Sequence, residues 1–139
     1  GLNLCDLGEK LVCSDENPYN VACFEKSRGR LGKKLRKKVE YVGKSAEQCV
    51  KDSKVLSKDV DVVVVDPPRK GLDDSVKKAL SNSEKYPALK TLVYISCGFQ
   101  AFVKDCGDLE KGGWKIEKAE GHVLFPGADA IETLAIFKR

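Results

Sequence analysis

Short apolar runs alternate with more polar, helix-compatible segments along the chain. Six runs rich in apolar or β-branched residues predict strands at 10–14, 39–42, 61–65, 91–96, 114–119 and 131–137. The polar segments predict helices at 18–27, 45–50, 73–81 and 99–109. This succession predicts an α/β fold in which βαβ units surround a mostly parallel sheet. Because only a loop joins the last two strands, we expect them to form an antiparallel pair at one end.

The end of the third predicted strand carries the first candidate for chemistry. Four consecutive valines at 62–65 predict a strand that is buried on both faces, as is typical of parallel sheets. The two prolines after Asp66 stop strand pairing, and Gly71 permits a tight turn. The next strand, 91–96, is followed by Cys97. Ligands of open α/β sheets bind beyond the carboxyl ends of strands, so this carboxylate and this thiol suggest an active site.

Composition narrows the class of protein further. A chain of 139 residues with 42% hydrophobic and 33% charged residues fits one globular domain with a modest core. No apolar run approaches the ~20 residues that cross a membrane, and the chain does not open on a signal or transit peptide. The six cysteines show no CxxC pair and no usual zinc spacing, so we expect no metal site and no disulfide framework. Reduced cysteines favour an intracellular, reducing compartment.

The net charge of +4 is unevenly distributed along the chain. Seven basic residues fall within eleven positions: Arg28, Arg30, Lys33, Lys34, Arg36, Lys37 and Lys38. This run either contacts the phosphates of a nucleic acid or is a solvated helix end and loop. In the second case the helix dipole favours cations near the C-terminus of the helix. We slightly prefer the second interpretation, because no aromatic residue lies between the charges to stack on bases.

Three motifs resemble those of the RNA uracil-C5 methyltransferases. The turn at 66–72, DPPRKGL, resembles the family's DPPRxGL motif, and the stretch 94–97, YISC, resembles its nucleophile motif. Phe125 and Pro126, followed by Glu132, resemble its FPxTxHxE ending at the family's spacing. The motifs occur in family order and the resemblance covers essentially the whole chain, which makes the combination specific.

The resemblance implies a Rossmann-like class I methyltransferase sheet, mostly parallel with an antiparallel C-terminal strand. It also implies an enzyme that uses S-adenosyl-L-methionine to make 5-methyluridine in RNA, in tRNA processing or in rRNA. By this resemblance Cys97 is the nucleophile that adds to uracil C6, and Glu132 is the base that removes the C5 proton. The related cytosine-C5 enzymes typically have a second cysteine at the position of Arg69, so uracil is favoured over cytosine.

The resemblance also implies which residues bind the cofactor. Asp15 follows the first predicted strand and matches the acidic residue that bonds the ribose hydroxyls, with the adjacent Glu16 as an alternative. Asp15 also has a second interpretation, because either Asn17 or Asp15 could cap the helix that follows. Ser45 matches the position beside the adenine, although a helix cap is its more ordinary role. Asp66 is expected to hold the cofactor or the target base.

The chain departs from the family pattern in several places. Gly98 and Phe99 stand where the family usually has Asn-Pro, and Ala128 and Ala130 stand at two positions that are commonly polar, changes that would alter target choice. The segment 1–4 resembles the tail of the glycine-rich cofactor loop, so we expect the first strand and the start of that loop to be absent. We therefore interpret 1–139 as a single, truncated catalytic domain. We expect it to need the missing N-terminal region or a partner chain, and not to be active alone.

Two alternatives to the uracil-C5 activity stay open. One is a catalytically silent RNA-binding module of the same fold, which the missing cofactor loop suggests. The other is a methyltransferase of this fold with another substrate, which Gly98 and its phenylalanine neighbour suggest. His122, the only histidine, is left out of the predicted site because it has no paired carboxylate at a recognisable spacing and is expected in a loop. Trp114 and Phe125 are expected in the core.

Overall fold

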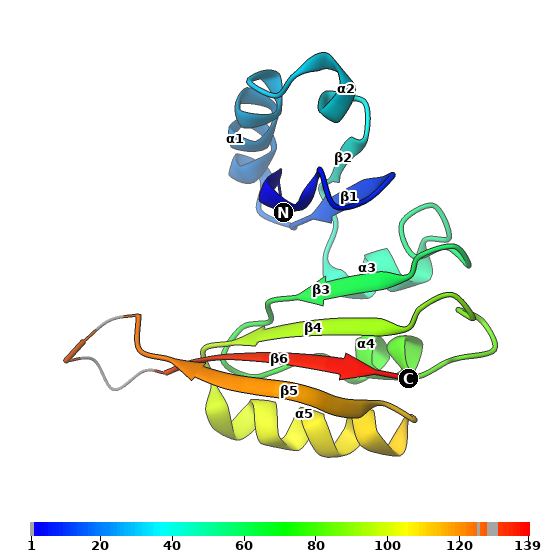
Figure 1. The fold of residues 1–139 in the computed structure, drawn as a ribbon, viewed down its shortest axis with the longest axis vertical. Coiled ribbons are helices and arrows are strands. Elements are labelled where there is room, and N and C mark those ends of the chain that lie inside the picture. The colour runs from blue at the N-terminus through cyan, green and yellow to red at the C-terminus, as the bar shows by residue number, and fades with distance from the viewer. Residues whose placement is uncertain (1, 125, 128–130) are drawn as a thin grey trace. The chain divides into compact units, whose positions relative to one another are not determined.

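The computed structural model describes residues 2–124, 126–127 and 131–139. Four residues on which the sequence analysis placed expectations lie outside the described part: Gly1, Phe125, Ala128 and Ala130. The chain divides into two compact units, Gly1–Val55 and Leu56–Arg139, which are described separately here (Figure 1).

The first unit is built on two parallel strands joined by a helical crossover. Its elements in chain order are a 3-10 turn (Leu2–Leu4), β1 (Leu11–Ser14), α1 (Pro18–Gly29), α2 (Lys33–Arg36), β2 (Val39–Val42) and α3 (Ala46–Lys51). Strand β1 pairs with β2 in parallel, from Leu11 opposite Val39 to Ser14 opposite Val42. Asn17 begins α1, because its side-chain oxygen accepts a hydrogen bond from the Tyr19 amide at 3.1 Å.

The second unit contains a four-stranded mixed sheet. Its elements are β3 (Val62–Val65), α4 (Asp74–Leu80), β4 (Thr91–Ser96), α5 (Phe99–Lys111), β5 (Lys115–His122) and β6 (Glu132–Lys138). The strand order is β3-β4-β6-β5; β3 and β4 run parallel, and β6 is antiparallel to both of its neighbours. The expected antiparallel pair of C-terminal strands is therefore confirmed, and the last strand of the chain inserts between β4 and β5 (Figure 1).

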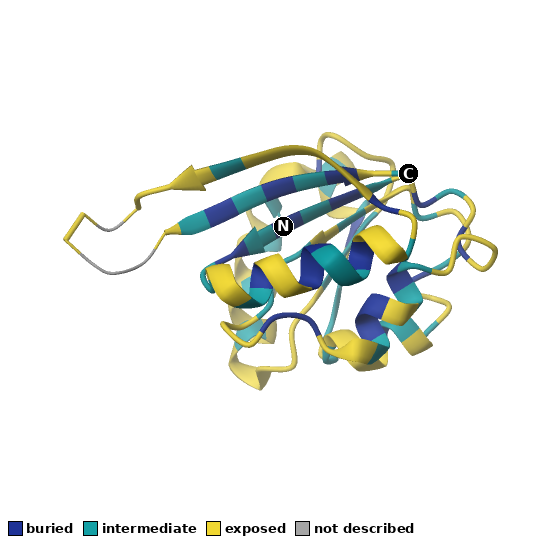
Figure 2. Ribbon diagram, turned by 90° about the horizontal axis from the view of Figure 1, so that it is seen from below, coloured by how far each residue is buried: buried dark blue, intermediate teal, exposed yellow. Residues whose placement is uncertain are grey.

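The core of the second unit lies between its sheet and its two longest helices. Helices α4 and α5 pack against each other on one face of the sheet, and the sides of these helices that face it are buried (Figure 2). Leu92 and Tyr94 of β4 and Phe137 of β6 are fully buried on this side. Trp114 is buried as expected, and its indole N–H donates to the backbone oxygen of Leu80 at 3.1 Å. This bond ties the start of β5 to the end of α4.

The expectation that the valines at 62–65 are buried on both faces is wrong. Val62 and Val64 are each 45% exposed, and their two neighbours are half-buried. The reason is topological: in the described part of the chain, β3 pairs with β4 alone and is an edge strand. Strand β1 likewise pairs with β2 alone in the part of the chain that the structure describes. Among these residues, each unit therefore has a parallel strand with one unpaired edge.

Candidate active site

Strand β4 ends in a tight turn that holds Cys97. Alternate residues of the strand are buried, and Tyr94 contacts Phe102 of α5 with ring centroids 5.3 Å apart. Two residues further on, Ser96 is buried on the same side, and its hydroxyl oxygen accepts a hydrogen bond from the Gly98 amide at 3.1 Å. This bond closes the turn around Cys97, which is half-buried and free of disulfide bonding.

The pairing of β4 with β6 relates the predicted nucleophile to the predicted base. The antiparallel register ends at Ser96 opposite Thr133, so Cys97 and Glu132 are the next opposed positions at this end of the sheet. Opposed residues of an antiparallel pair lie on the same face, close enough for their side chains to interact. On its other side, Glu132 pairs with His122 of β5. Three potentially reactive residues, Cys97, Glu132 and His122, therefore lie at the same end of the adjacent strands β4, β6 and β5.

Glu132 also lines a small cavity of about 170 Å³. Its lining residues are Ile95, His122, Leu124, Glu132, Thr133 and Leu134. Three of these six side chains, Ile95, Leu124 and Leu134, are aliphatic, so a carboxylate and an imidazole share a partly apolar recess. A recess of this kind suits the flat ring of a base placed beside a proton acceptor.

His122 was missed by the sequence analysis, which expected it in a loop. It is the last residue of β5, a longer strand than predicted, and its Nε2 lies 3.7 Å from a carboxylate oxygen of Glu120. A signal was available: Glu120 is two residues away, and alternate residues of a strand share a face. The pairing of His122 with Glu132 has no such local signal.

The Asp66 loop lies directly against the Cys97 turn. Asp66 is exposed at the end of β3, and the Gly71 amide donates to the Pro68 carbonyl at 2.9 Å, which closes the loop. A Cβ atom at Gly98 would lie only 2.5 Å from the carbonyl oxygen of Arg69. The backbone of the loop therefore occupies the space that a side chain at position 98 would need. The structure brings Asp66, Cys97 and Glu132 to one end of the sheet of the second unit.

Asp15 and Ser45 belong to the first unit. Asp15 is exposed where β1 ends, its amide donates to the Val42 carbonyl at 3.4 Å, and one carboxylate oxygen accepts from the Asn17 amide at 2.7 Å. The cap of α1 is Asn17, so the alternative role of Asp15 as the capping residue is not observed. The other carboxylate oxygen of Asp15 has no hydrogen bond among the described residues. Glu16 is exposed beside it.

Ser45 begins α3 through a reciprocal pair of hydrogen bonds. Its hydroxyl oxygen accepts from the Gln48 amide at 3.3 Å, and its own amide donates to the Gln48 side chain at 3.0 Å. The helix-cap role is therefore observed. Asp15 and Ser45 follow the carboxyl ends of neighbouring parallel strands, the arrangement expected for ligand-binding residues of such a sheet.

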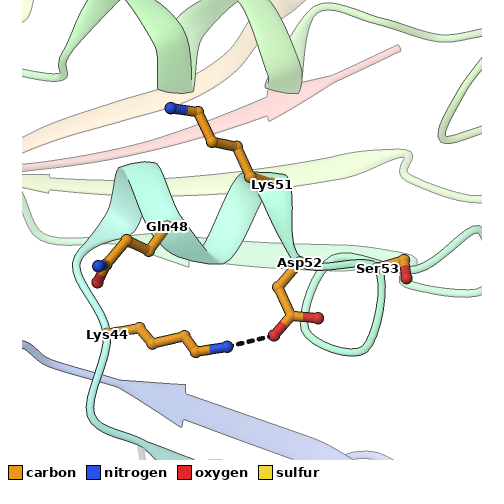
Figure 3. A pocket seen from close by; sticks show the side chains of 5 residues that line it. All are labelled: Lys44, Gln48, Lys51, Asp52 and Ser53. Atoms are coloured by element: carbon orange, nitrogen blue, oxygen red, sulfur yellow. Dashed lines mark hydrogen bonds and ion pairs between the residues drawn. The ribbon is translucent and has the colours of Figure 1, made fainter.

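An open hollow of about 480 Å³ lies beside α3. Its lining side chains are Lys44, Gln48, Lys51, Asp52 and Ser53 (Figure 3). An ion pair joins Lys44 to Asp52 across the hollow. Hydrogen bonding to this partner raises the pKa of Lys44, and the bond from Lys44 lowers the pKa of Asp52. The hollow is polar, and its three charged side chains already have partners, because Lys51 pairs with Glu47 at 2.8 Å.

No group of three or more histidine, cysteine or acidic residues in the described part of the chain is arranged to hold a metal ion. No helix among those residues has the length and apolar character needed to span a membrane.

Comparisons with known proteins converge on one family. The profile of the tRNA (uracil-5-)-methyltransferase family matches residues 30–139. An uncharacterized RNA methyltransferase of Protochlamydia amoebophila is 33% identical over all 139 residues, which make up 34% of that protein. Another, of Clostridium acetobutylicum, is 34% identical over 100 residues, or 70% of this chain and 20% of that protein. The chain therefore spans about a third of the length of the first relative and less of the second.

Solved structures of methyltransferases share the fold. The N-methyltransferase NodS of Bradyrhizobium japonicum, in complex with S-adenosyl-L-homocysteine, superposes with a TM-score of 0.71 and 16% identity over 99% of this chain and 70% of that chain. An rRNA methylase of Streptococcus thermophilus gives a TM-score of 0.70 and 10% identity over 99% and 78% of the two chains. At these identities the likeness establishes the class I methyltransferase fold.

Proposed function

Because the chain belongs to the tRNA (uracil-5-)-methyltransferase family, we propose that it is the C-terminal part of an enzyme that methylates uracil C5 in RNA. The observation that carries this proposal is the register of β4 and β6, which ends at Ser96 opposite Thr133, so that Cys97 and Glu132 lie directly beyond this last pair. Residues 1–139 together belong to one catalytic domain, which works with further chain from the longer protein or a partner.

Uracil C5 is a weak nucleophile, and the proposed role of Cys97 is to change this. The Cys97 thiolate adds to C6, forming an S–C6 bond and moving the C5=C6 electron pair into an enolate. C5 then takes a methyl group, which S-adenosylmethionine supplies when bound. The Glu132 carboxylate removes the remaining C5 proton, the C5=C6 bond re-forms and the thiolate leaves. The recess that Glu132 lines supports this role, because it offers room for a base beside the carboxylate.

The donor set of the first unit fits S-adenosylmethionine. Asp15 is exposed at the end of a parallel strand and has a carboxylate oxygen left to accept hydrogen bonds from ribose hydroxyls. Ser45 follows the neighbouring strand and caps α3, and by the family resemblance we assign it to the position beside the adenine. Asp66 is exposed beside the Cys97 turn, and we assign it to orienting the target base or the cofactor. Glu16 is the alternative to Asp15 as the residue that bonds the ribose hydroxyls, and substituting each of the two separately tests which of them does so.

RNA is the proposed partner, and one surface of the first unit supports it. We define the basic surface as five exposed residues whose side chains have no ion pair or hydrogen bond among the described residues: Lys26, Arg30, Lys33, Lys34 and Lys37. The other basic residues of this segment are used internally. Arg36, for example, donates to the backbone oxygen of Gly29 at 2.7 Å. The surface is thus available to phosphates.

A trapped covalent adduct tests the proposed chemistry. A short RNA carrying 5-fluorouridine has no C5 proton to remove, so the enzyme–RNA bond should persist after methyl transfer. We expect a denaturation-resistant adduct with the longer protein that contains this chain, and none with Cys97→Ala. Glu132→Gln should accumulate an adduct with ordinary uridine RNA as well. An adduct that survives in Cys97→Ala would remove Cys97 from the role of nucleophile.

The basic surface also favours a second candidate function, a catalytically silent RNA-binding module of the same fold. This module would bind RNA in a salt-sensitive way without S-adenosylmethionine. Titration of the protein with S-adenosylhomocysteine separates the two functions: micromolar binding supports the methyltransferase, whereas RNA binding with no cofactor binding supports the module. A third candidate, the same fold with another substrate, is favoured by Gly98 and is separated by comparing RNA with and without the target uridine.

A further inference from the structure

Asp105 of α5 is a buried carboxylate outside the proposed site. It is 2% exposed, and its oxygens accept three hydrogen bonds or ion contacts. The Leu72 amide and the Tyr94 hydroxyl each donate to Oδ2 at 2.7 Å, and the Lys77 ammonium lies 3.1 Å from Oδ1. The three donors come from the loop after β3, from β4 and from α4. One side chain therefore joins three segments.

The Asp66–Leu72 loop is pressed against this carboxylate. Gly71 has a φ of +86°, and a Cβ atom there would lie 2.6 Å from Asp105 Oδ2. Only glycine combines this backbone conformation with so close an approach. The adjoining Leu72 amide would otherwise be a buried donor without a partner, so the carboxylate fixes where the loop ends.

Strand β4, which carries Tyr94, also leads into Cys97. Tyr94 lies three residues before Cys97, and the Gly98 backbone after it contacts the backbone of Arg69 in the loop. Burial, followed by the bond to Asp105, raises the pKa of Tyr94, so this phenol remains a donor at all ordinary pH values. The loop that presents Asp66 and the turn that presents Cys97 are thereby attached to each other at two points.

We propose that Asp105 is a positioning residue that holds the Asp66 loop in register with the Cys97 turn. The inference rests on the proposed function, because under that function the Asp66 loop and the Cys97 turn act on the same substrate. Stability alone does not account for this charge: replacing buried ionic groups with apolar residues of similar size is often neutral or stabilising. A second carboxylate, Asp108, also pairs with Lys77, at 2.7 Å, and has no contact with the loop among the described residues.

Asp108 therefore provides the matched control. Asp105→Asn and Asp108→Asn each remove one negative charge from α5. In both variants the lost carboxylate is one that pairs with Lys77. Only the first acts on the bonds to Leu72 and Tyr94: a neutral amide oxygen accepts them less strongly than a carboxylate, and the NH2 group of the amide would face the Lys77 ammonium, donor against donor. Tyr94→Phe removes a single donor and keeps the carboxylate, which gives a milder variant should Asp105→Asn fold poorly.

The primary measurements do not depend on methyltransferase activity. In the full 139-residue chain, we expect the Leu72 amide to exchange with solvent about tenfold faster in Asp105→Asn, with a smaller increase in Tyr94→Phe. We expect the rate at which Cys97 reacts with iodoacetamide to differ about tenfold between Asp105→Asn and the wild type. Both rates should stay within about twofold of wild type in Asp108→Asn. Equal effects of Asp105→Asn and Asp108→Asn on both rates would overturn the proposal.

The trapping assay then tests the catalytic consequence in the longer protein. With 5-fluorouridine RNA, we expect Asp105→Asn to slow adduct formation at saturating RNA by about tenfold or more, with little change in the half-saturating RNA concentration. Asp108→Asn should leave both quantities near wild type. An unchanged saturating rate in Asp105→Asn would also overturn the positioning role. Failure of the wild-type protein to form an adduct would instead reject the proposed function, and the two rates above would still decide how the loop is held.

Discussion

The turn at Cys97 depends on the absence of a side chain at the next residue. Gly98 stands where the resemblance to the family leads us to expect asparagine, and its backbone lies against Arg69. This departure therefore has a physical reason: with the loop in this position there is no room for a Cβ atom. Gly107, in the middle of α5, is the opposite case, because a Cβ atom there would have no neighbour within 4 Å.

This contrast predicts opposite effects of two identical substitutions. Gly98→Ala should lower the free energy of unfolding by about 1–3 kcal/mol, because the loop backbone must shift to admit the methyl group. Gly107→Ala should raise it by about 0.5–1 kcal/mol, because alanine loses less conformational freedom in a helix. Urea unfolding of the two variants and the wild type measures both. If Gly98→Ala were as stable as wild type, the loop and the turn would not be in close contact.

Residues were predictable from the sequence where their role depends on local spacing. Asn17 and Ser45 cap helices, and Trp114 is buried, as the pattern indicates. The role of Asp105 was not predictable, because its contact with Leu72 joins residues 33 positions apart. The placement of His122 beside Glu132 depends in the same way on strand pairing.

At the scale of elements, the strands and helices agree with the predicted ones to within about three residues, apart from α2, which was not predicted. The pattern did not indicate which strands are neighbours. The last strand, β6, runs antiparallel to both neighbours and lies between β4 and β5. This position brings Glu132, at the start of β6, to the end of β4 that leads into Cys97. The exposure of β3 was mispredicted for the same reason: an unbroken run of valines does not reveal whether a strand has one partner or two.

The pairing of α4 with α5 predicts a dependence of stability on acid pH. Lys77 of α4 bonds Asp108 of α5, and this bond lowers the pKa of Asp108 below its ordinary value of 3.8. A carboxylate with a depressed folded pKa stabilises the protein above its ordinary pKa, and this contribution is lost as the pH falls through the folded value. We therefore expect the free energy of unfolding to fall between about pH 5 and pH 2, and to fall less in Asp108→Asn.

Asp59→Asn is the control for this experiment. Asp59 is exposed, and its carboxylate has no ion pair among the described residues. Urea unfolding at a series of pH values should therefore give the wild-type pH dependence for Asp59→Asn and a flatter one for Asp108→Asn. Identical curves for all three proteins would mean that the bond to Lys77 does not stabilise the helix pair.

At the scale of the whole molecule, charge is the property that is most unevenly distributed. Residues 26–38 contain eight basic and no acidic residues, whereas the chain as a whole carries +4, so the remaining residues carry a net −4. Three of the eight, Arg28, Arg36 and Lys38, bond to backbone oxygens within the first unit. These bonds brace the segment and leave the five residues of the basic surface for a partner. The acidic remainder would repel RNA, so binding should concentrate on this surface.

Salt-dependent RNA binding tests this distribution. Lys33→Glu/Lys34→Glu reverses two charges of the basic surface on α2, and Lys104→Glu/Lys115→Glu makes the same change in charge at exposed positions of the second unit. Each phosphate contact contributes about 0.7 to the slope of log affinity against log salt for single-stranded RNA, so the first variant should lose about 1.4 from this slope. The second variant should keep the wild-type slope, because a change in net charge alone does not remove a contact. Equal losses in both variants would show that RNA responds to overall charge and not to the basic surface.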